Sequence, residues 1–323
     1  MTDGLVTTII PVFNRPDQLR EAVASALEQD WPVQIVVVDD GSTDSTHAVA
    51  RALANAHPDL VEAVSQPNAG PGAARQAGLW RARGEFIQYL DSDDILLPGK
   101  FAAQVAALRA NPRADVAYGM TRFRHATGEV ARGAWKGSGT ARATMFPSFL
   151  LERWWDTPTP LYRREICERA GPWTNLRLEE DWEYDCRIAA LGARLVWCEQ
   201  FVCEVRDHEG GRLSRAPARD PARLRERARS HALILSHARR AGIAADSPEL
   251  RQFARALFLL ARQCGAAGLA AESKSMLNLA RDASINARGG GVDYRAYAAV
   301  ARIVGWGAVG RASEWLDRVR NKR

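Results

Sequence analysis

Along the N-terminal third of the chain, short apolar runs alternate with stretches in which apolar residues recur at helical spacing. The runs 6–10, 33–38 and 86–90 are bounded by turn-forming and polar residues, as is typical of buried strands. Residues 18–27 carry apolar side chains on one helical face. Strands and helices in alternation predict a mostly parallel sheet with right-handed crossovers, and therefore an α/β fold.

Polar and aromatic residues stand where each predicted strand ends. Phe13 follows the first strand, the pair Asp39 and Asp40 follows the second, and the loop 91–94 (Asp-Ser-Asp-Asp) follows the third. The carboxyl ends of parallel strands meet at one edge of a sheet, which is where ligands bind in open α/β folds. Two carboxylates spaced i, i+2 suit a hard divalent cation that neutralises a diphosphate. The same residues are also good turn and cap formers, so that second interpretation stays open.

Beyond residue 100 the pattern predicts a helix over 100–110, a strand over 116–120 and a further strand with the runs 195–198 and 201–205. From residue 217 onward Arg and Ala dominate, and apolar residues return at helical spacing. We therefore expect an α/β domain over 1–215, followed by a C-terminal helical region over 216–323.

A net charge of +6 and a pI near 9.3 would suit nucleic acid, an anionic membrane or acidic substrates. Zinc-finger spacing and RNP-like aromatic motifs are absent and Arg is scattered along helices, so we expect no nucleic-acid partner. The five cysteines form no CxxC pair, and reduced, buried thiols are expected. The N-terminus enters the first strand without a signal pattern, and no apolar run approaches the ~20 residues of a membrane helix, so we expect a cytoplasmic protein.

Five segments occur in a characteristic order along roughly the first two-thirds of the chain. They are 10–14 (IPVFN), 37–44 (VVDDGSTD), 68–75 (NAGPGAAR), 84–94 (GEFIQYLDSDD) and 180–183 (EDWE). With them the sequence resembles a family 2 glycosyltransferase of the GT-A fold. The resemblance implies an inverting enzyme that moves a hexosyl group from a nucleotide-sugar to an alcohol, with residues 1–100 holding the donor and 101–215 the acceptor.

By this resemblance, residues at the three strand ends bind the donor, a nucleoside-diphosphate sugar and most simply a UDP-sugar. An aromatic ring at Phe13 would stack on the base, although packing beside its neighbours is the commoner role of such a residue. One of the two paired carboxylates would read the base, and we favour Asp40, with Asp39 orienting the loop; both also suit helix capping. Arg75 would meet base or phosphate, or form a surface salt bridge. The donor-binding residues expected are Pro11, Phe13, Asp39, Asp40, Arg75, Asp91 and Ser92.

The resemblance also assigns a metal ligand and a base. Asp93 would coordinate Mg²⁺ or Mn²⁺, both of which suit oxygen ligands and diphosphates. His208 matches a histidine that many relatives place near the metal. Asp181 matches the general base, which removes the proton of the attacking alcohol. Because acidic residues in a first helical turn are favourable, capping is the alternative for Asp181.

Two other functions fit the sequence less well. A sugar nucleotidyltransferase would want a Gly-rich phosphate loop after the first strand, which segment 11–16 lacks. A non-catalytic carbohydrate-binding or scaffold protein would not need Asp93, Asp181 and His208.

The tail after residue 291 combines aromatic residues with a net charge of +4 over 302–323. It predicts either a contact with the inner face of the cell membrane, where lipid-linked acceptors reside, or a core helix with a solvated Arg face.

Overall fold

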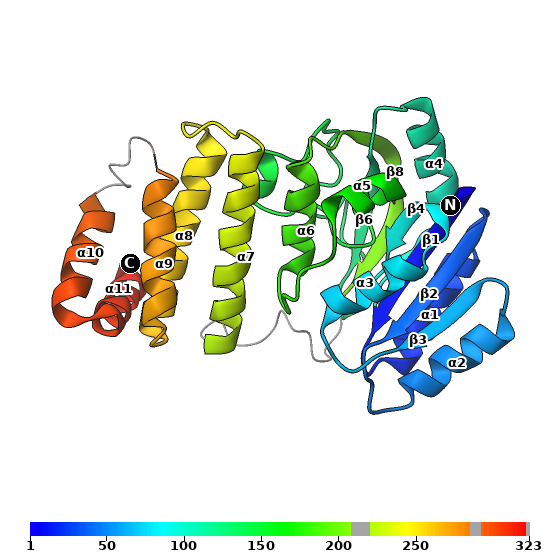
Figure 1. Ribbon diagram of the computed structural model, residues 1–323, viewed down its shortest axis with the longest axis horizontal. Helices are drawn as coiled ribbons and strands as arrows, with labels where there is room; N and C mark the ends of the chain where they lie inside the picture. The colour runs from blue at the N-terminus through cyan, green and yellow to red at the C-terminus, as the bar shows by residue number, and fades with distance from the viewer. Residues whose placement is uncertain (208–219, 285–291, 321–323) are drawn as a thin grey trace. The chain divides into compact units, whose positions relative to one another are not determined.

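The computed structural model describes residues 1–207, 220–284 and 292–320 and divides into two compact units (Figure 1). Unit 1 comprises residues 1–145 and 153–210, and unit 2 comprises 146–152 and 211–323. The predicted boundary at 215/216 lies outside the described residues. All five cysteines are buried and free.

Unit 1 is built on one mixed sheet with strand order β3-β2-β1-β4-β7-β6-β8-β5. Neighbours β1–β2, β2–β3, β1–β4 and β6–β8 are parallel, while β4–β7, β6–β7 and β5–β8 are antiparallel. The described strands are β1 (Thr2–Val12), β2 (Val33–Asp39), β3 (Val61–Ser65), β4 (Gly84–Tyr89), β5 (Ile95–Leu96), β6 (Val116–Arg124), β7 (Leu161–Arg163) and β8 (Leu195–Arg206).

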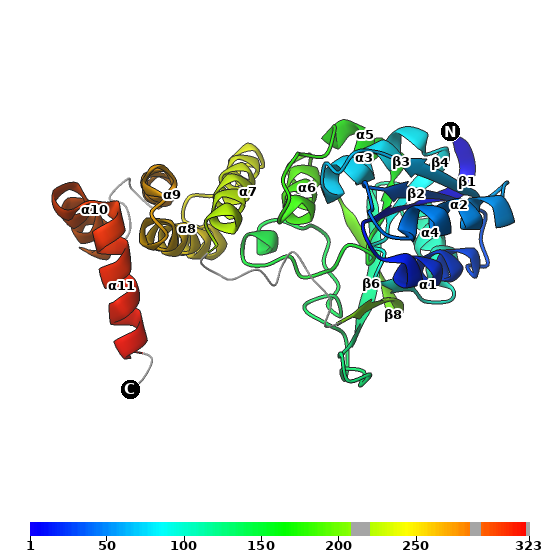
Figure 2. The same cartoon turned by 90° about the horizontal axis from the view of Figure 1, so that it is seen from below.

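Helices of unit 1 cover both faces of this sheet. Figure 2 shows α3 and α5 on one side of the central strands and α1 on the other. The described helices are α1 (Pro16–Leu27), α2 (Thr46–Ala56), α3 (Pro71–Arg81), α4 (Lys100–Ala110), α5 (Arg164–Ala170) and α6 (Glu180–Ala189). Mixed α/β layering confirms the predicted fold class.

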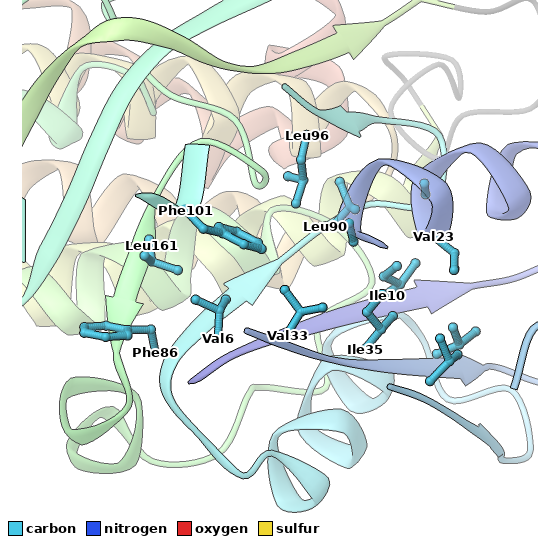
Figure 3. Close-up of a cluster of buried hydrophobic side chains, with 14 of the residues drawn as sticks. Val6, Ile10, Val23, Val33, Ile35, Phe86, Leu90, Leu96, Phe101 and Leu161 are labelled. Atoms are coloured by element: carbon cyan, nitrogen blue, oxygen red, sulfur yellow. The ribbon is translucent and has the colours of Figure 1, made fainter. Parts of the chain in front are cut away.

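The larger core lies between the sheet and α1, α2 and α4 (Figure 3). Because side chains alternate along a strand, Ile35 and Val37 of β2 face this core while Val36 and Val38 face α3. Burying each of these side chains stabilises the fold by about 1.5–3 kcal/mol. The two-sided burial explains why the strand reads as a continuous apolar run.

Helix α3 approaches β1 closely at a glycine. A Cβ built on Gly78 would lie 2.3 Å from Cγ2 of Ile9, so only glycine permits this separation. The short distance matters for function because α3 carries Arg75, which lies one helical turn earlier.

Strand register determines which residues can meet at the edge of the sheet. Val12 at the end of β1 pairs with Asp39 at the end of β2, and Ile9 pairs with Tyr89 at the end of β4. The carboxyl ends of these three parallel strands therefore lie at one edge, as the sequence predicted. The strand expected with the runs 195–198 and 201–205 is β8, which continues through both runs opposite a register shift at Gly119/Met120.

Unit 2 is helical in its described residues, and α8 contacts α7, α9 and α11. Ser247 caps α8 by accepting a hydrogen bond from Leu250 N at 3.2 Å, and Pro248 occupies its first turn. The described elements are η1 (Ser148–Leu150), α7 (Pro221–Arg240), α8 (Pro248–Ala266), α9 (Ala270–Asp282), α10 (Val292–Val304) and α11 (Trp306–Arg320). No helix of the described residues is long and apolar enough to cross a membrane.

Candidate active site

The loop after β1 is fastened to the loop after β2. Asn14 has a left-handed backbone (φ 53°), its N–H donates to Ser42 Oγ at 2.9 Å, and its Oδ1 accepts from Thr43 N at 2.8 Å. A non-glycine residue in this conformation stores strain that the surrounding contacts must hold, a feature common at functional sites. The neighbouring Phe13 is 44% exposed, so its ring is available at the edge of the sheet, whereas Pro11 is buried inside β1.

Asp40 holds the segment that leads into α3. Its Oδ1 accepts hydrogen bonds from Gln66 Nε2 (2.7 Å) and Ala69 N (2.9 Å), and its Oδ2 accepts from Gly70 N (2.8 Å). Gly70 has φ +93°, a conformation that favours glycine. Three donors on one buried carboxylate leave about one lone-pair position for a ligand.

Asp39 has a different set of partners. Its Oδ1 accepts from Ser42 N at 3.1 Å, which is the turn chemistry expected of the pair, and its Oδ2 lies 3.2 Å from His47 Nδ1. Both carboxylates are buried, at 2% and 4% exposure. The predicted base-reading pair therefore holds two loops in place and keeps part of its accepting capacity.

Arg75 connects the donor loop to α6. Its guanidinium donates to Asp91 Oδ1 and to Glu180 Oε1, each at 2.7 Å, and lies 4.9 Å from the ring centroid of Trp173. With only 3% exposure, Arg75 is not a surface salt bridge, and that alternative is wrong. Burial favours the neutral guanidine, but the charges of Asp91, Glu180 and Asp181 outweigh it and raise the pKa of Arg75, so it stays protonated.

The acidic loop after β4 concentrates carboxylates in a small volume. Asp93 forms an ion pair with Arg15, and Asp94 Oδ1 accepts from Arg206 N at 3.0 Å. Burial raises the pKa of Asp94 well above its usual range, and the negative charges of Asp93 and Asp91 raise it further. Ser92 is buried between these carboxylates in the chain.

A divalent cation fits this loop. Within 1–207, 220–284 and 292–320, no group of three or more His, Cys, Asp or Glu side chains is placed to hold a metal ion by itself. An ion that is bound mainly through a diphosphate needs only one or two carboxylates from the protein. The crowded carboxylates of the loop offer hard oxygen ligands and would gain from a nearby positive charge. His208 lies outside the described residues.

Asp181 lies in the first turn of α6, as predicted, and is held by neighbours from another segment. Its Oδ2 accepts from Arg153 Nη1 at 2.6 Å and from Thr157 Oγ1 at 3.3 Å, and its Oδ1 accepts from Trp182 N at 2.7 Å. Burial acts to raise the pKa of Asp181, but the charges of Arg153 and then Arg75 outweigh it, so the pKa lies below its usual value. The carboxylate is therefore ionised at neutral pH and 27% exposed.

Three residues of the site carried no recognisable signal in the sequence. Arg153 and Asp185 form an ion pair at 2.7 Å behind Asp181, and Arg15 contacts Asp93. The i, i+4 spacing of Asp181 and Asp185 was the one available clue, because it places both carboxylates on one face of α6. Trp154, Trp155 and Trp173 are buried, as aromatic residues that pack in a core are.

The chain is similar in sequence to known glycosyltransferases. Residues 7–168 match the sequence model described as glycosyl transferase family 2. An uncharacterised glycosyltransferase of Nostoc sp. is 28% identical over 207 residues, which is 62% of this chain and 61% of that protein. The succinoglycan biosynthesis protein ExoO of Rhizobium meliloti is 39% identical over 101 residues, 31% of this chain and 28% of that protein. The chain thus spans less than two-thirds of the length of these curated relatives.

Solved structures show the same fold. S. aureus TarS 1-349 in complex with UDP-GlcNAc has a TM-score of 0.64 at 20% identity, covering 96% of this chain and 91% of that chain. The mannosyltransferase PcManGT from Pyrobaculum calidifontis, in complex with GDP-Man and Mn²⁺, has a TM-score of 0.53 at 23% identity, covering 97% and 87%.

Proposed function

The chain belongs to glycosyl transferase family 2, and from this premise we propose that it is an inverting hexosyltransferase. It moves a sugar from a nucleoside-diphosphate sugar, most simply a UDP-sugar, to a hydroxyl of a saccharide or lipid-linked acceptor. One observation carries the proposal: buried Arg75 joins Asp91 of the donor loop to Glu180, the neighbour of Asp181. The donor-binding residues and the general base Asp181 are thereby held at fixed positions relative to one another.

In the proposed reaction the acceptor hydroxyl attacks the anomeric carbon of the donor. A carbon–oxygen bond forms to the acceptor, and the bond from the anomeric carbon to the diphosphate oxygen breaks, so the nucleoside diphosphate leaves with that electron pair. The hydroxyl proton passes to the carboxylate of Asp181. Attack opposite the leaving group inverts the anomeric configuration.

Residues at the edge of the sheet would bind the nucleotide. The exposed ring of Phe13 would stack on the base, and the remaining accepting capacity of Asp40 would take its imino hydrogen, with Asp39 holding the loop. Asp91 and Ser92 would contact the ribose side, with Pro11 shaping the strand end beneath. The TarS complexes with UDP-GlcNAc and UDP support a UDP-linked donor, and the GDP-Man complex of PcManGT keeps guanine as the alternative.

A divalent metal, Mn²⁺ or Mg²⁺, would be held by Asp93 together with His208. When bound, it supplies positive charge that stabilises the leaving diphosphate. Mn²⁺ in the PcManGT complex supports a metal in the family. Asp93 must give up its ion pair with Arg15, at least in part, to bind the ion.

A near-isosteric substitution tests whether Asp181 is the general base. Asp181→Asn keeps the shape and the capping ability of the residue, so the fold and UDP affinity should survive while transfer falls by roughly 10²–10⁴-fold. The matched control is Glu180→Gln, which changes the adjacent carboxylate. Retained transfer in Asp181→Asn, with loss in Glu180→Gln, would move the role to Glu180.

The two rival functions predict other products. A sugar nucleotidyltransferase would release pyrophosphate from a nucleoside triphosphate and a sugar phosphate, and a carbohydrate-binding scaffold would release nothing. Incubation with nucleotide-sugars and Mn²⁺, followed by chromatography, separates these cases. The proposal requires the release of nucleoside diphosphate.

For the acceptor side we propose that the tail contacts an anionic bilayer. Tyr294 and Tyr297 of α10 are buried in unit 2, as in a core helix, but Ile303 and Val304 are 83% and 54% exposed and directly follow exposed Arg302. Attraction of basic residues to such a surface is worth about 1 kcal/mol each and is screened by salt. Ile303→Glu should abolish co-sedimentation with anionic liposomes without unfolding the protein. Equal sedimentation of both proteins at low salt would refute the contact.

A further inference from the structure

Arg153 lies between two carboxylates of α6 and bonds to both. Its Nη1 donates to Asp181 Oδ2 at 2.6 Å, and its Nε donates to Asp185 Oδ2 at 2.7 Å. The Arg153 side chain is only 11% exposed. The planar fork of a guanidinium suits this double contact, which an ammonium group on a flexible stem would not reproduce.

Asp185 fixes the far end of Arg153. Besides Arg153, it accepts hydrogen bonds from Trp155 Nε1 on Oδ2 at 2.8 Å and from Tyr162 Oη on Oδ1 at 2.6 Å. Its side chain is 1% exposed, and the two aromatic donors are themselves buried. A buried carboxylate with three donors has little freedom to move, so Arg153 is anchored to a rigid group.

The donors on Asp181 are distributed unequally between its two oxygens. Oδ2 accepts from both Arg153 and Thr157, which fills its two lone-pair positions. Among the described residues, Oδ1 accepts a hydrogen bond from the backbone N–H of Trp182 alone, so it keeps one position. A proton that arrives at Asp181 would therefore be received by Oδ1.

We propose that Arg153 is a positioning residue, fixed by the buried carboxylate of Asp185, which holds Oδ2 of Asp181 and leaves Oδ1 to receive the acceptor's proton. The inference rests on the proposed role of Asp181 as the base. It adds two residues to the reaction, neither of which touches the reacting atoms.

The charges around Asp181 determine how the positioning can be measured. Arg153, Arg75 and Lys136 face it with positive charge, and Glu180 opposes them. Loss of Arg153 removes the largest favourable charge while burial remains, so the pKa of Asp181 should rise. An opposite charge at this distance is worth about one to three pKa units. The Arg153 pair thus makes Asp181 a weaker base that stays ionised in acid.

The direct experiment is a ¹³C NMR titration of Asp181 in the full chain, assigned with Asp181→Asn. Arg153→Gln should raise the pKa of Asp181 by about one to three units and move the acid limb of kcat upward by the same amount. Thr157→Val is the matched control, because it removes a neutral donor from the same Oδ2 and should shift the pKa far less. Arg153→Lys keeps the charge and should give an intermediate shift; it also serves if Arg153→Gln does not fold.

Asp185→Asn separates positioning from simple charge. If Asp185 acted only as a nearby negative charge, its removal would lower the pKa of Asp181. If it anchors Arg153, removal should raise that pKa and lower kcat, while UDP affinity stays the same. A lowered pKa in Asp185→Asn, or an unmoved pKa in folded Arg153→Gln, overturns the proposal.

The outcomes also distinguish this inference from the function on which it rests. A pKa and an acid limb that rise together support both. If the pKa of Asp181 rises while the acid limb of kcat stays unchanged, Arg153 has no positioning role in catalysis. If the wild-type chain transfers no sugar from any donor while the NMR shifts appear as expected, the contact network stands and the proposed function fails.

Discussion

Replacement of Arg75 by methionine should destabilise unit 1 strongly, because Arg75 is the one positively charged partner of buried Glu180 among the described residues. Breaking a buried ion pair by removing one partner costs about 3–5 kcal/mol. The contact with Glu180 carries most of this cost, since Glu180 is 9% exposed, whereas Asp91 is 32% exposed and its contact is worth about 0–1 kcal/mol. We therefore expect a loss of about 3–5 kcal/mol at pH 7.

Arg81 on the same helix supplies the matched control. It pairs with Glu62 at 2.8 Å, a distance close to that of the Arg75 pairs, but the two side chains are 56% and 39% exposed. Arg81→Met should cost no more than about 1 kcal/mol, because water screens an exposed pair. The comparison isolates burial, since both substitutions exchange Arg for Met on α3.

The cost of Arg75→Met should depend on pH. Burial raises the pKa of Glu180 even with Arg75 present, and loss of Arg75 removes the charge that opposes this rise. A carboxyl group whose folded pKa lies above its unfolded value destabilises the fold increasingly as pH rises through that interval. The loss should therefore be smaller at pH 5 than at pH 8, and Glu180→Gln in the same chain should restore much of it.

Urea unfolding followed by circular dichroism measures these free energies, with the transitions of the two units fitted separately. Equal costs for Arg75→Met and Arg81→Met would refute the argument from burial. A cost for Arg75→Met that does not change between pH 5 and pH 8 would refute the role assigned to Glu180.

Asp93→Asn should weaken Mn²⁺-dependent UDP binding by at least about tenfold in calorimetry, because the cation site loses a charge; unchanged affinity would exclude Asp93 as a ligand. Burial lowers the pKa of Lys100 to about 7, so the unfolded chain binds the extra proton between pH 7 and 10.5. Wild-type stability should consequently rise with pH relative to Lys100→Met by up to about 1.4 kcal/mol per unit, and parallel stability curves would contradict this. Gly78→Ala should cost about 1–3 kcal/mol, since its Cβ meets Ile9 inside the sheet–α3 contact; an unchanged melting temperature would show that α3 can shift freely.

The pattern of apolar and polar residues along the chain was sufficient to predict where the strands end and where the helix that carries Asp181 begins. Apolar runs followed directly by Phe13, by Asp39 and Asp40, and by Asp91 placed these residues at one edge, because parallel strands align their carboxyl ends. An apolar run followed directly by polar residues involves only neighbours in the chain, so it can be recognised without knowledge of the fold. The start of α6 at Glu180 follows the same logic.

The sequence did not predict which charged side chains form ion pairs. Arg75 was open to interpretation as a surface residue, Arg153 carried no motif, and Asp185 was one acidic residue among several in α6. Their roles follow from burial and from contacts across 16 to 105 positions of the chain. Ion pairs between residues so distant in sequence produce no periodic pattern, so they cannot be predicted from a local stretch of the chain.

The sequence by itself determined the α/β fold, the edge at which the polar loops gather and the family to which the chain belongs, because these depend on short-range periodicity and contiguous motifs. Only the tertiary structure decided which charges meet. An ion pair such as Arg153 with Asp181 depends on a few ångströms between separate segments, and its strength depends on the water that the surrounding fold excludes.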